Sequence, residues 1–128
     1  MDTEATGQTQ GLNTEPKVVR ANQFVLEDAN GKTRALLDVD KEGVPGLYLY
    51  DENATPRVML GVGTYGSVLA MFDRNGKNRV SLAVSNDVSS LRLSDGNGKP
   101  RVRVTVGEDG VPGLELLYGD GVQIWSKP

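Results

Sequence analysis

Four acidic loops are the part of this sequence whose residue types and spacing come closest to a binding site. They begin at Asp28, Asp51, Asp73 and Asp95 and continue as Asp-x-Asn, followed in three of the four by Gly-Lys. Oxygen ligands at alternate positions before a glycine open calcium loops of the EF-hand type, but such loops close on a bidentate glutamate, which is missing here. A hairpin turn explains the same residues, because Asp caps its own loop and Gly adopts a positive φ. We therefore expect turns at these loops and no metal ion.

A second group of carboxylates stands near a single predicted loop and consists of Asp38, Asp40 and Glu42. Three carboxylates close together could bind a cation through their oxygens. Acidic side chains are mostly found on the surface, where they keep a protein soluble. We expect these three to serve solubility.

Enzymatic chemistry has few candidates in this chain. The sequence contains no histidine and no cysteine, which removes the commonest general base, the thiolate nucleophile and the commonest ligands of transition metals. Paired carboxylates can hydrolyse glycosides, yet no pair here stands in a context that would form a cleft. The sequence therefore predicts a protein that is not an enzyme, with no catalytic residues, no cofactor and no metal site.

The acidic loops belong to a tandem repeat. Their aspartates recur at nearly constant intervals, and the same intervals separate Arg34, Arg57, Arg79 and Arg101. Each arginine opens a run of alternating apolar residues, such as Val80, Leu82 and Val84, and a fifth, degenerate copy follows in 114–124. A fixed period of this kind decides the architecture before any local propensity does.

Each repeat is predicted to be a β-hairpin, because alternation with a period of two bounded by Asn-Gly is the standard signal for one. Ten strands of about five residues follow, joined alternately by tight turns and by looser connections, of which 43–46 and 110–113 both read Gly-Val-Pro-Gly. No segment has the apolar period of a helix. At 128 residues the chain has room for one domain. We expect a flexible polar leader over 1–17 and a repetitive β domain over 18–128.

The repeats place their aliphatic side chains on one face of the predicted sheet, and that face needs a covering layer. A sandwich would need a long crossover, which the chain lacks, and a ten-stranded barrel lined with Leu and Val would be left partly hollow. Three chains wrapping these faces around a common axis suit short strands and small β-branched residues. We therefore expect an all-β fold of hairpin repeats with a period of about 22 residues, assembled as a homotrimeric β-prism or β-spiral. The alternative is a monomeric up-and-down β-barrel.

The repeat cycle and its ending form a pattern of their own. The cycle combines Asp-x-Asn-Gly-Lys with Arg-Val-x-Leu-x-Val, and the chain closes on Trp-Ser-Lys-Pro at 125–128. This pattern resembles a group of uncharacterised bacterial tandem β-hairpin repeat proteins that often end in Trp-Ser-x-Pro, and the resemblance covers about residues 18–128. The motifs that carry this resemblance are structural, and the group has no agreed activity from which a function could be expected. More loosely, the cycle is similar to the repeats of trimeric viral and phage fibre shafts, although its period is longer than theirs.

The charge balance argues against a nucleic-acid partner, because the formal net charge is −3. Basic side chains are expected to form ladders on the polar face, at Lys32, Arg34, Lys77, Arg79, Lys99, Arg101 and Arg103. Such ladders could bind an anionic polysaccharide or a phosphate backbone. Pairing with acidic residues across strands, which also protects a sheet against aggregation, fits the acidic balance better.

The sequence also bears on location. No stretch is long or apolar enough to span a bilayer, and the N-terminus lacks the pattern of a secretory signal. We expect no membrane insertion and a soluble chain. An extracellular, cell-surface or virion setting is favoured over the cytoplasm.

One apolar patch is predicted on the otherwise polar face of the sheet. If consecutive strands are neighbours, Tyr48, Tyr50, Met59 and Phe72 form this possible contact patch, and Gly61 allows a tyrosine ring to lie over the backbone. An exposed apolar patch marks a contact surface, and aromatic side chains also grip sugars. Packing under a loop or against another subunit explains the same residues.

These features favour a non-enzymatic structural or interaction module, such as a stalk, a fibre segment or a surface scaffold. A β domain that binds a glycan or a small apolar ligand is the alternative. A closed barrel would hold the ligand inside, whereas an open sheet would use its tyrosines outside. The expected partners are copies of the same chain, with a trimer favoured, and a glycan or another protein. Trp125, the only tryptophan, is expected to cap the open end of the core.

Overall fold

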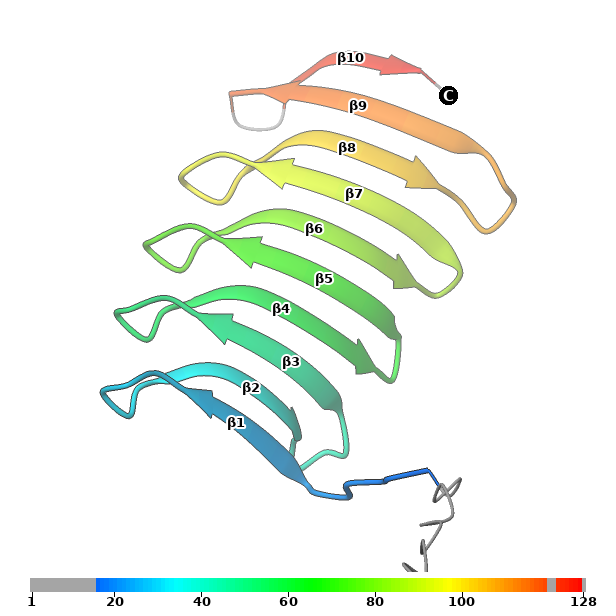
Figure 1. Ribbon diagram of the computed structural model, residues 1–128. Coiled ribbons are helices and arrows are strands. Elements are labelled where there is room, and N and C mark those ends of the chain that lie inside the picture. The colour runs from blue at the N-terminus through cyan, green and yellow to red at the C-terminus, as the bar shows by residue number, and fades with distance from the viewer. Residues whose placement is uncertain (1–15, 120–121, 128) are drawn as a thin grey trace, which may run out of the picture.

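The chain forms one open β-sheet with a simple meander topology (Figure 1). The structure, a computed structural model, describes residues 16–119 and 122–127, and for 122 and 124–127 it describes the backbone. The strands are β1 Gln23–Glu27, β2 Thr33–Val39, β3 Pro45–Tyr50, β4 Pro56–Gly63, β5 Gly66–Phe72, β6 Asn78–Ser85, β7 Val88–Ser94, β8 Pro100–Val106, β9 Pro112–Tyr118 and β10 Val122–Lys127. They follow one another in the sheet in sequence order.

The predicted all-β hairpin meander is confirmed, and the described residues form ten strands joined by nine antiparallel pairings. Most strands are somewhat longer than expected, and they range from the short β1 to β4 and β6, the longest. The barrel alternative is wrong, because in the described part of the chain β1 pairs with β2 alone and β10 with β9 alone. Of the predicted leader, residues 1–15 lie outside the described residues, and Pro16 and Lys17 are exposed coil.

The acidic loops fold as the sequence predicts. In the loop after β5, the Asp73 N–H donates to the Lys77 carbonyl at 2.9 Å, and the Gly76 N–H donates to the Asp73 carbonyl at 3.0 Å. The Asp73 carboxylate oxygen Oδ1 accepts from the N–H groups of Asn75 and Lys77 at 2.9 and 3.1 Å. Gly76 has a φ of 74°, which glycine adopts without strain. The loops at Asp28, Asp51 and Asp95 repeat these bonds.

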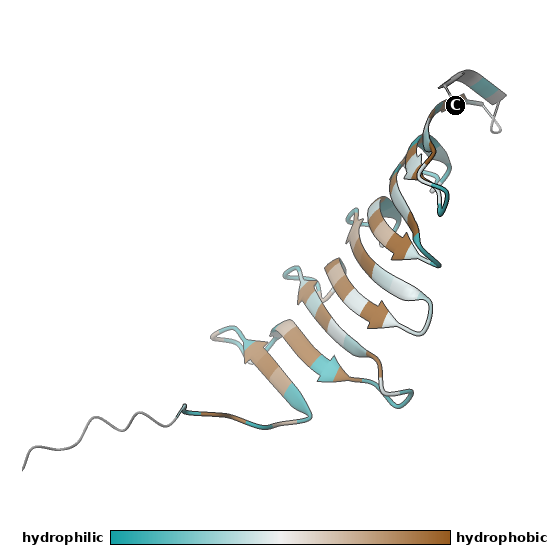
Figure 2. Cartoon of the chain, turned by 90° about the vertical axis from the view of Figure 1, so that its right-hand side faces the viewer, coloured by the Kyte–Doolittle hydropathy of each residue, from teal (hydrophilic) through white to brown (hydrophobic). Residues whose placement is uncertain are grey.

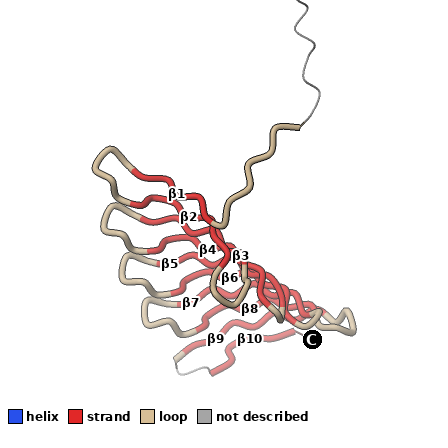
Figure 3. Tube along the Cα trace, turned by 90° about the horizontal axis from the view of Figure 1, so that it is seen from below, coloured by secondary structure: helices blue, strands red, loops and turns tan. Residues whose placement is uncertain are grey.

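The connections predicted to be looser are as tight as the others. The Asp40 N–H donates to the Val44 carbonyl at 3.0 Å and the Asp40 carboxylate caps its own loop, as in the acidic loops. Two further connections contain two residues each, 64–65 and 86–87. Asn86 and Asp87 both have positive φ, at 46° and 66°, which matches a type I′ hairpin turn. Tight loops therefore lie along both borders of the sheet (Figure 3).

The register of the strands arranges the aliphatic side chains in rows across one face, which we call the apolar face. Apolar and polar residues alternate along the strands in Figure 2. The middle row contains Phe24, Leu37, Leu47, Leu60, Leu69, Leu82, Leu91, Val104 and Leu114. The row nearer the acidic loops contains Leu26, Ala35, Leu49, Val58, Met71, Val80, Leu93, Val102 and Leu116.

Within residues 16–119 and 122–127, no second layer lies over the apolar face. Leu60 is 47% exposed and Val62 is 54% exposed, although both lie in the middle of the sequence. Among the described residues the one buried hydrophobic residue is Ala70, which lies on the opposite face. A domain ordinarily buries its apolar surface between at least two layers. The apolar face is therefore largely exposed to solvent in the described part of the chain.

Candidate functional site

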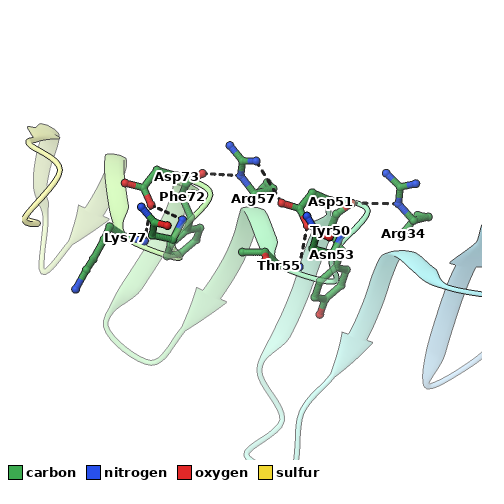
Figure 4. Close-up of polar contacts among 10 residues, drawn as sticks. Arg34, Tyr50, Asp51, Asn53, Thr55, Arg57, Phe72, Asp73 and Lys77 are labelled. Atoms are coloured by element: carbon green, nitrogen blue, oxygen red, sulfur yellow. Dashed lines mark hydrogen bonds and ion pairs between the residues drawn. The ribbon is translucent and has the colours of Figure 1, made fainter.

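The repeat arginines form a ladder along the border that carries the acidic loops (Figure 4). Arg57 donates from Nε to the Phe72 carbonyl at 2.9 Å and from Nη1 to the Asp51 carboxylate at 3.3 Å. Arg57 thus joins the loop of its own hairpin to the end of β5, the first strand of the next hairpin. Arg34 and Arg79 make equivalent contacts to the carbonyls of Tyr50 and Ser94.

This ladder gives the predicted basic residues a structural role. The repeat arginines pair mainly within their own hairpin, with Asp28, Asp51, Asp73 and Asp95, instead of across strands as expected. Arg103 does pair across strands, donating to the Glu115 carboxylate at 2.6 Å. Lys32 donates to the Glu52 carbonyl at 3.1 Å and connects the first two acidic loops. The repeat arginines are thus engaged both with the aspartate of their own loop and with a backbone carbonyl of the next repeat.

The loop aspartates are held in the charged form. The Lys32 N–H lowers the pKa of Asp28, the Thr55 N–H that of Asp51 and the Lys77 N–H that of Asp73, each with help from a nearby arginine. Partial burial raises the pKa of Asp95, but hydrogen bonds from Arg101 and from the loop outweigh it, so this pKa is lowered as well. A lowered pKa means that the carboxylate is bound more favourably by the folded chain than by the unfolded chain.

Stability is therefore expected to fall in acid. The four loop carboxyls contribute stability above their ordinary pKa of 3.8, and they lose it as the pH falls through their lower folded values. Urea midpoints measured between about pH 5 and pH 2 should decline steeply below pH 4. The Asp73→Asn variant keeps the loop acceptor but cannot titrate, so its midpoint should decline less. A midpoint that does not change over this range would contradict the assignment.

The second group of carboxylates does not converge. Asp40 directs its carboxylate at the N–H groups of Glu42 and Val44, both at 2.9 Å. In the described part of the chain, no three acidic, His or Cys side chains lie close enough to hold a metal ion. Asp40 thus acts as a turn residue.

The structure brings most of the predicted contact patch together on the face opposite the apolar face, which we call the opposite face. Tyr48, Met59 and Ala70 are direct neighbours on β3, β4 and β5. The rings of Tyr48 and Tyr50 are stacked, with centroids 6.5 Å apart and an interplanar angle of 27°. Tyr50 and Phe72 point to the same side of the sheet in Figure 4. These side chains are half-buried, so the patch is less exposed than expected.

The glycine that accommodates a tyrosine ring is Gly46, where the sequence suggested Gly61. A Cβ on Gly46 would lie 2.7 Å from the Tyr48 ring, whereas a Cβ on Gly61 would meet nothing closer than the Pro45 carbonyl oxygen, at 3.7 Å. Tyr48 therefore lies over its own strand.

Beyond this patch the opposite face becomes polar. Ser81 is buried, and Arg92 donates to its hydroxyl at 3.3 Å. Arg92 stands directly opposite Arg103, which in turn contacts Glu115. The opposite face thus changes from aromatic to basic along the sheet. The apolar face keeps its rows of apolar side chains from β1 to β9.

Each face also has a shallow hollow that the sequence did not indicate. One, of about 430 Å³, lies among Leu60, Leu69, Leu82, Leu91 and Val104 of the apolar face. The other, of about 810 Å³, lies over β1, β2 and β3 and includes Val25, Leu36 and Tyr50 of the opposite face. The alternation rule could have placed Val25 and Leu36 beside the tyrosines, because they share their row with Tyr48.

Two further sequence predictions concern a cap at Trp125 and the absence of a membrane-spanning segment. The side chain of Trp125, expected to cap the core, lies outside the described side chains. Among the described residues, no helix has the length and apolar character needed to cross a membrane.

No protein-family model matches the chain, and comparison with curated proteins finds no significant relative. Function must therefore be inferred from the fold and from the chemistry of its two faces.

Proposed function

We propose that the protein is a non-enzymatic structural module whose copies associate through the apolar face. The observation that carries this proposal is the uncovered middle row, in which Leu37, Leu60 and Leu82 are each 46–47% exposed. A contiguous apolar surface of this kind marks an interaction site, because burying it removes apolar area from water. The row runs from β1 to β9, so a partner must be as long as the sheet itself.

The accessible surface supports a second copy as this partner. The chain exposes 10140 Å², whereas a compact monomer of its mass, 13.7 kDa, exposes about 6600 Å². Even if residues 1–15 supplied as much as an unfolded segment of that length, about 2300 Å², more than about 1000 Å² of excess would remain. A standard interface takes about 800 Å² from each partner.

Strand length favours three copies around one axis. A strand of seven residues, such as β2 or β8, spans about 23 Å. If three sheets of this width form the sides of a triangular prism, the central axis lies about 7 Å from each sheet. This distance is close to half of the about 10 Å that separates packed sheets. Four sheets of this width would lie farther from the axis and would leave a central gap. The resulting prism would serve as a stalk, a fibre segment or a surface scaffold.

Thiol protection tests this proposal, because the chain has no cysteine of its own. Leu60→Cys places one thiol on the apolar face, and Val25→Cys places one on the opposite face. The two positions are 47% and 48% exposed in the single chain, so equal rates are expected from a monomer. Association should slow the reaction of the Leu60→Cys thiol with a soluble thiol reagent about tenfold or more relative to Val25→Cys. Equal rates at high protein concentration would count against the proposal.

A further inference from the structure

The hollow over β1, β2 and β3 combines an apolar floor with a polar rim. Its volume is about 810 Å³, which lies in the range of small-molecule sites. Val25, Leu36 and Tyr50 provide the apolar and aromatic surface. The rim is formed by Gln23, Glu27, Lys32, Thr33, Glu52 and Asn53.

The aromatic part of this floor is held in place by its neighbours. Tyr50 stacks on Tyr48, and Tyr48 lies against Gly46, where a Cβ would come within 2.7 Å of the ring. Burial, followed by Tyr48 and Asp38, raises the pKa of Tyr50, so its hydroxyl stays protonated and can donate a hydrogen bond. The two rings therefore form one platform along β3.

The rim offers both donors and acceptors. Lys32 donates to the Glu52 carbonyl at 3.1 Å and thereby connects the first two acidic loops. Glu27 and Glu52 can accept hydrogen bonds, while Gln23 and Asn53 can both donate and accept. Two carboxylates and one ammonium give the rim a slight negative charge, which favours a neutral ligand with many hydroxyl groups over an anion.

The fold does not require these side chains. The positions equivalent to Tyr48 are Val25, Ala70 and Arg92, and the positions equivalent to Tyr50 are Glu27, Phe72 and Ser94. All of these hairpins form the same turn. The tyrosines of β3 are thus a local property of one repeat, and the hairpin architecture leaves them free to serve binding.

We propose that this hollow binds a neutral saccharide chain, with the C–H face of one sugar ring on Tyr50 and the sugar hydroxyls on the rim. Tyrosine suits this role because it presents an apolar ring together with a polar tip. The site lies on the opposite face and stays accessible when the apolar face is covered. It therefore does not depend on the self-association proposed above.

Affinity electrophoresis of the full chain tests this site. The probes are native gels cast with neutral soluble polysaccharides, namely a β-glucan, a xylan, a galactomannan and a dextran. At least one gel is expected to retard the wild-type protein, and Tyr50→Ala should weaken that binding about tenfold or more. Tyr50→Phe keeps the ring and should retain most of the binding.

Tyr65→Ala is the matched control, since Tyr65 is a 73% exposed tyrosine on the border of the sheet far from the hollow, and this variant should bind normally. Melting curves and mass in solution should be the same for all three variants, which separates loss of the site from loss of fold or of association. Unretarded migration in all four gels, or binding that survives Tyr50→Ala, would overturn the proposal. Retardation only by an anionic gel of polygalacturonate, abolished by salt, would overturn it as well.

Discussion

Replacing Leu82 by aspartate is expected to abolish self-association. Leu82 lies in the middle row of the apolar face, directly between Leu69 and Leu91, and is 46% exposed in the single chain. In an assembly each copy would bury one unpaired carboxylate among leucines, which costs roughly 2 kcal/mol or more per copy. Leu82→Asp should therefore remain at the monomer mass of 13.7 kDa in light scattering at concentrations where we expect the wild type to associate.

Ser90→Asp provides the control for this variant. Ser90 lies on β7 next to Leu91 but on the opposite face, where it pairs with Ala83. Ser90 is half-buried, but its side chain is on the face away from the proposed interface, so the mass should match that of the wild type. If Ser90→Asp also dissociated, or if Leu82→Asp kept the wild-type mass, the apolar face would not be the interface.

Replacing Gly66 by alanine should destabilise the fold more than any other exchange of a glycine for alanine in the described part of the chain. Gly66 has a φ of 146°, and a Cβ there would overlap the carbonyl oxygen of Val84 and lie 2.8 Å from its carbonyl carbon. The neighbouring strand β6 would have to move, and its pairing with β5 begins at this point. We expect a loss of roughly 3 kcal/mol or more in the free energy of unfolding, measured by urea titration.

Gly63→Ala is the matched substitution, because Gly63 pairs with Gly66 across the same two-residue turn. A Cβ at Gly63 meets no atom within 4 Å, so this variant should differ little from the wild type. Gly76→Ala should fall in between, since Gly76 has a φ of 74° in open space and Ala54 occupies the equivalent position of another loop at 60°. Similar midpoints for the Gly63 and Gly66 variants would show that the backbone clash can be relieved.

The repeat made much of this fold predictable from sequence. The spacing of Asp28, Asp51, Asp73 and Asp95 located the hairpin loops, and the alternation after each repeat arginine located the apolar face. These features are local, since a turn is determined by a few adjacent residues and the face of a strand residue by its period of two. The predicted neighbours Tyr48 and Met59 were found together for the same reason.

Other features depend on contacts between residues that are distant in sequence or between chains. The ring of Tyr48 covers Gly46 because of the rotamer it adopts, which a spacing does not specify. Arg57 reaches the Phe72 carbonyl because the next hairpin stacks beside its own, so a ladder between repeats replaced the expected pairs across strands. The hollow beside Tyr50 requires side chains from three strands and two loops. What covers the apolar face would depend on contacts between separate chains, which the spacing of residues within one chain does not specify.

The mass of the wild-type chain in solution tests the central claim most directly. Self-association of three copies through the apolar face predicts a mass three times the chain mass of 13.7 kDa, measured by sedimentation equilibrium or light scattering. A mass twice that of the chain would contradict the threefold arrangement. A single species of 13.7 kDa that persists as the concentration rises would contradict the account as a whole.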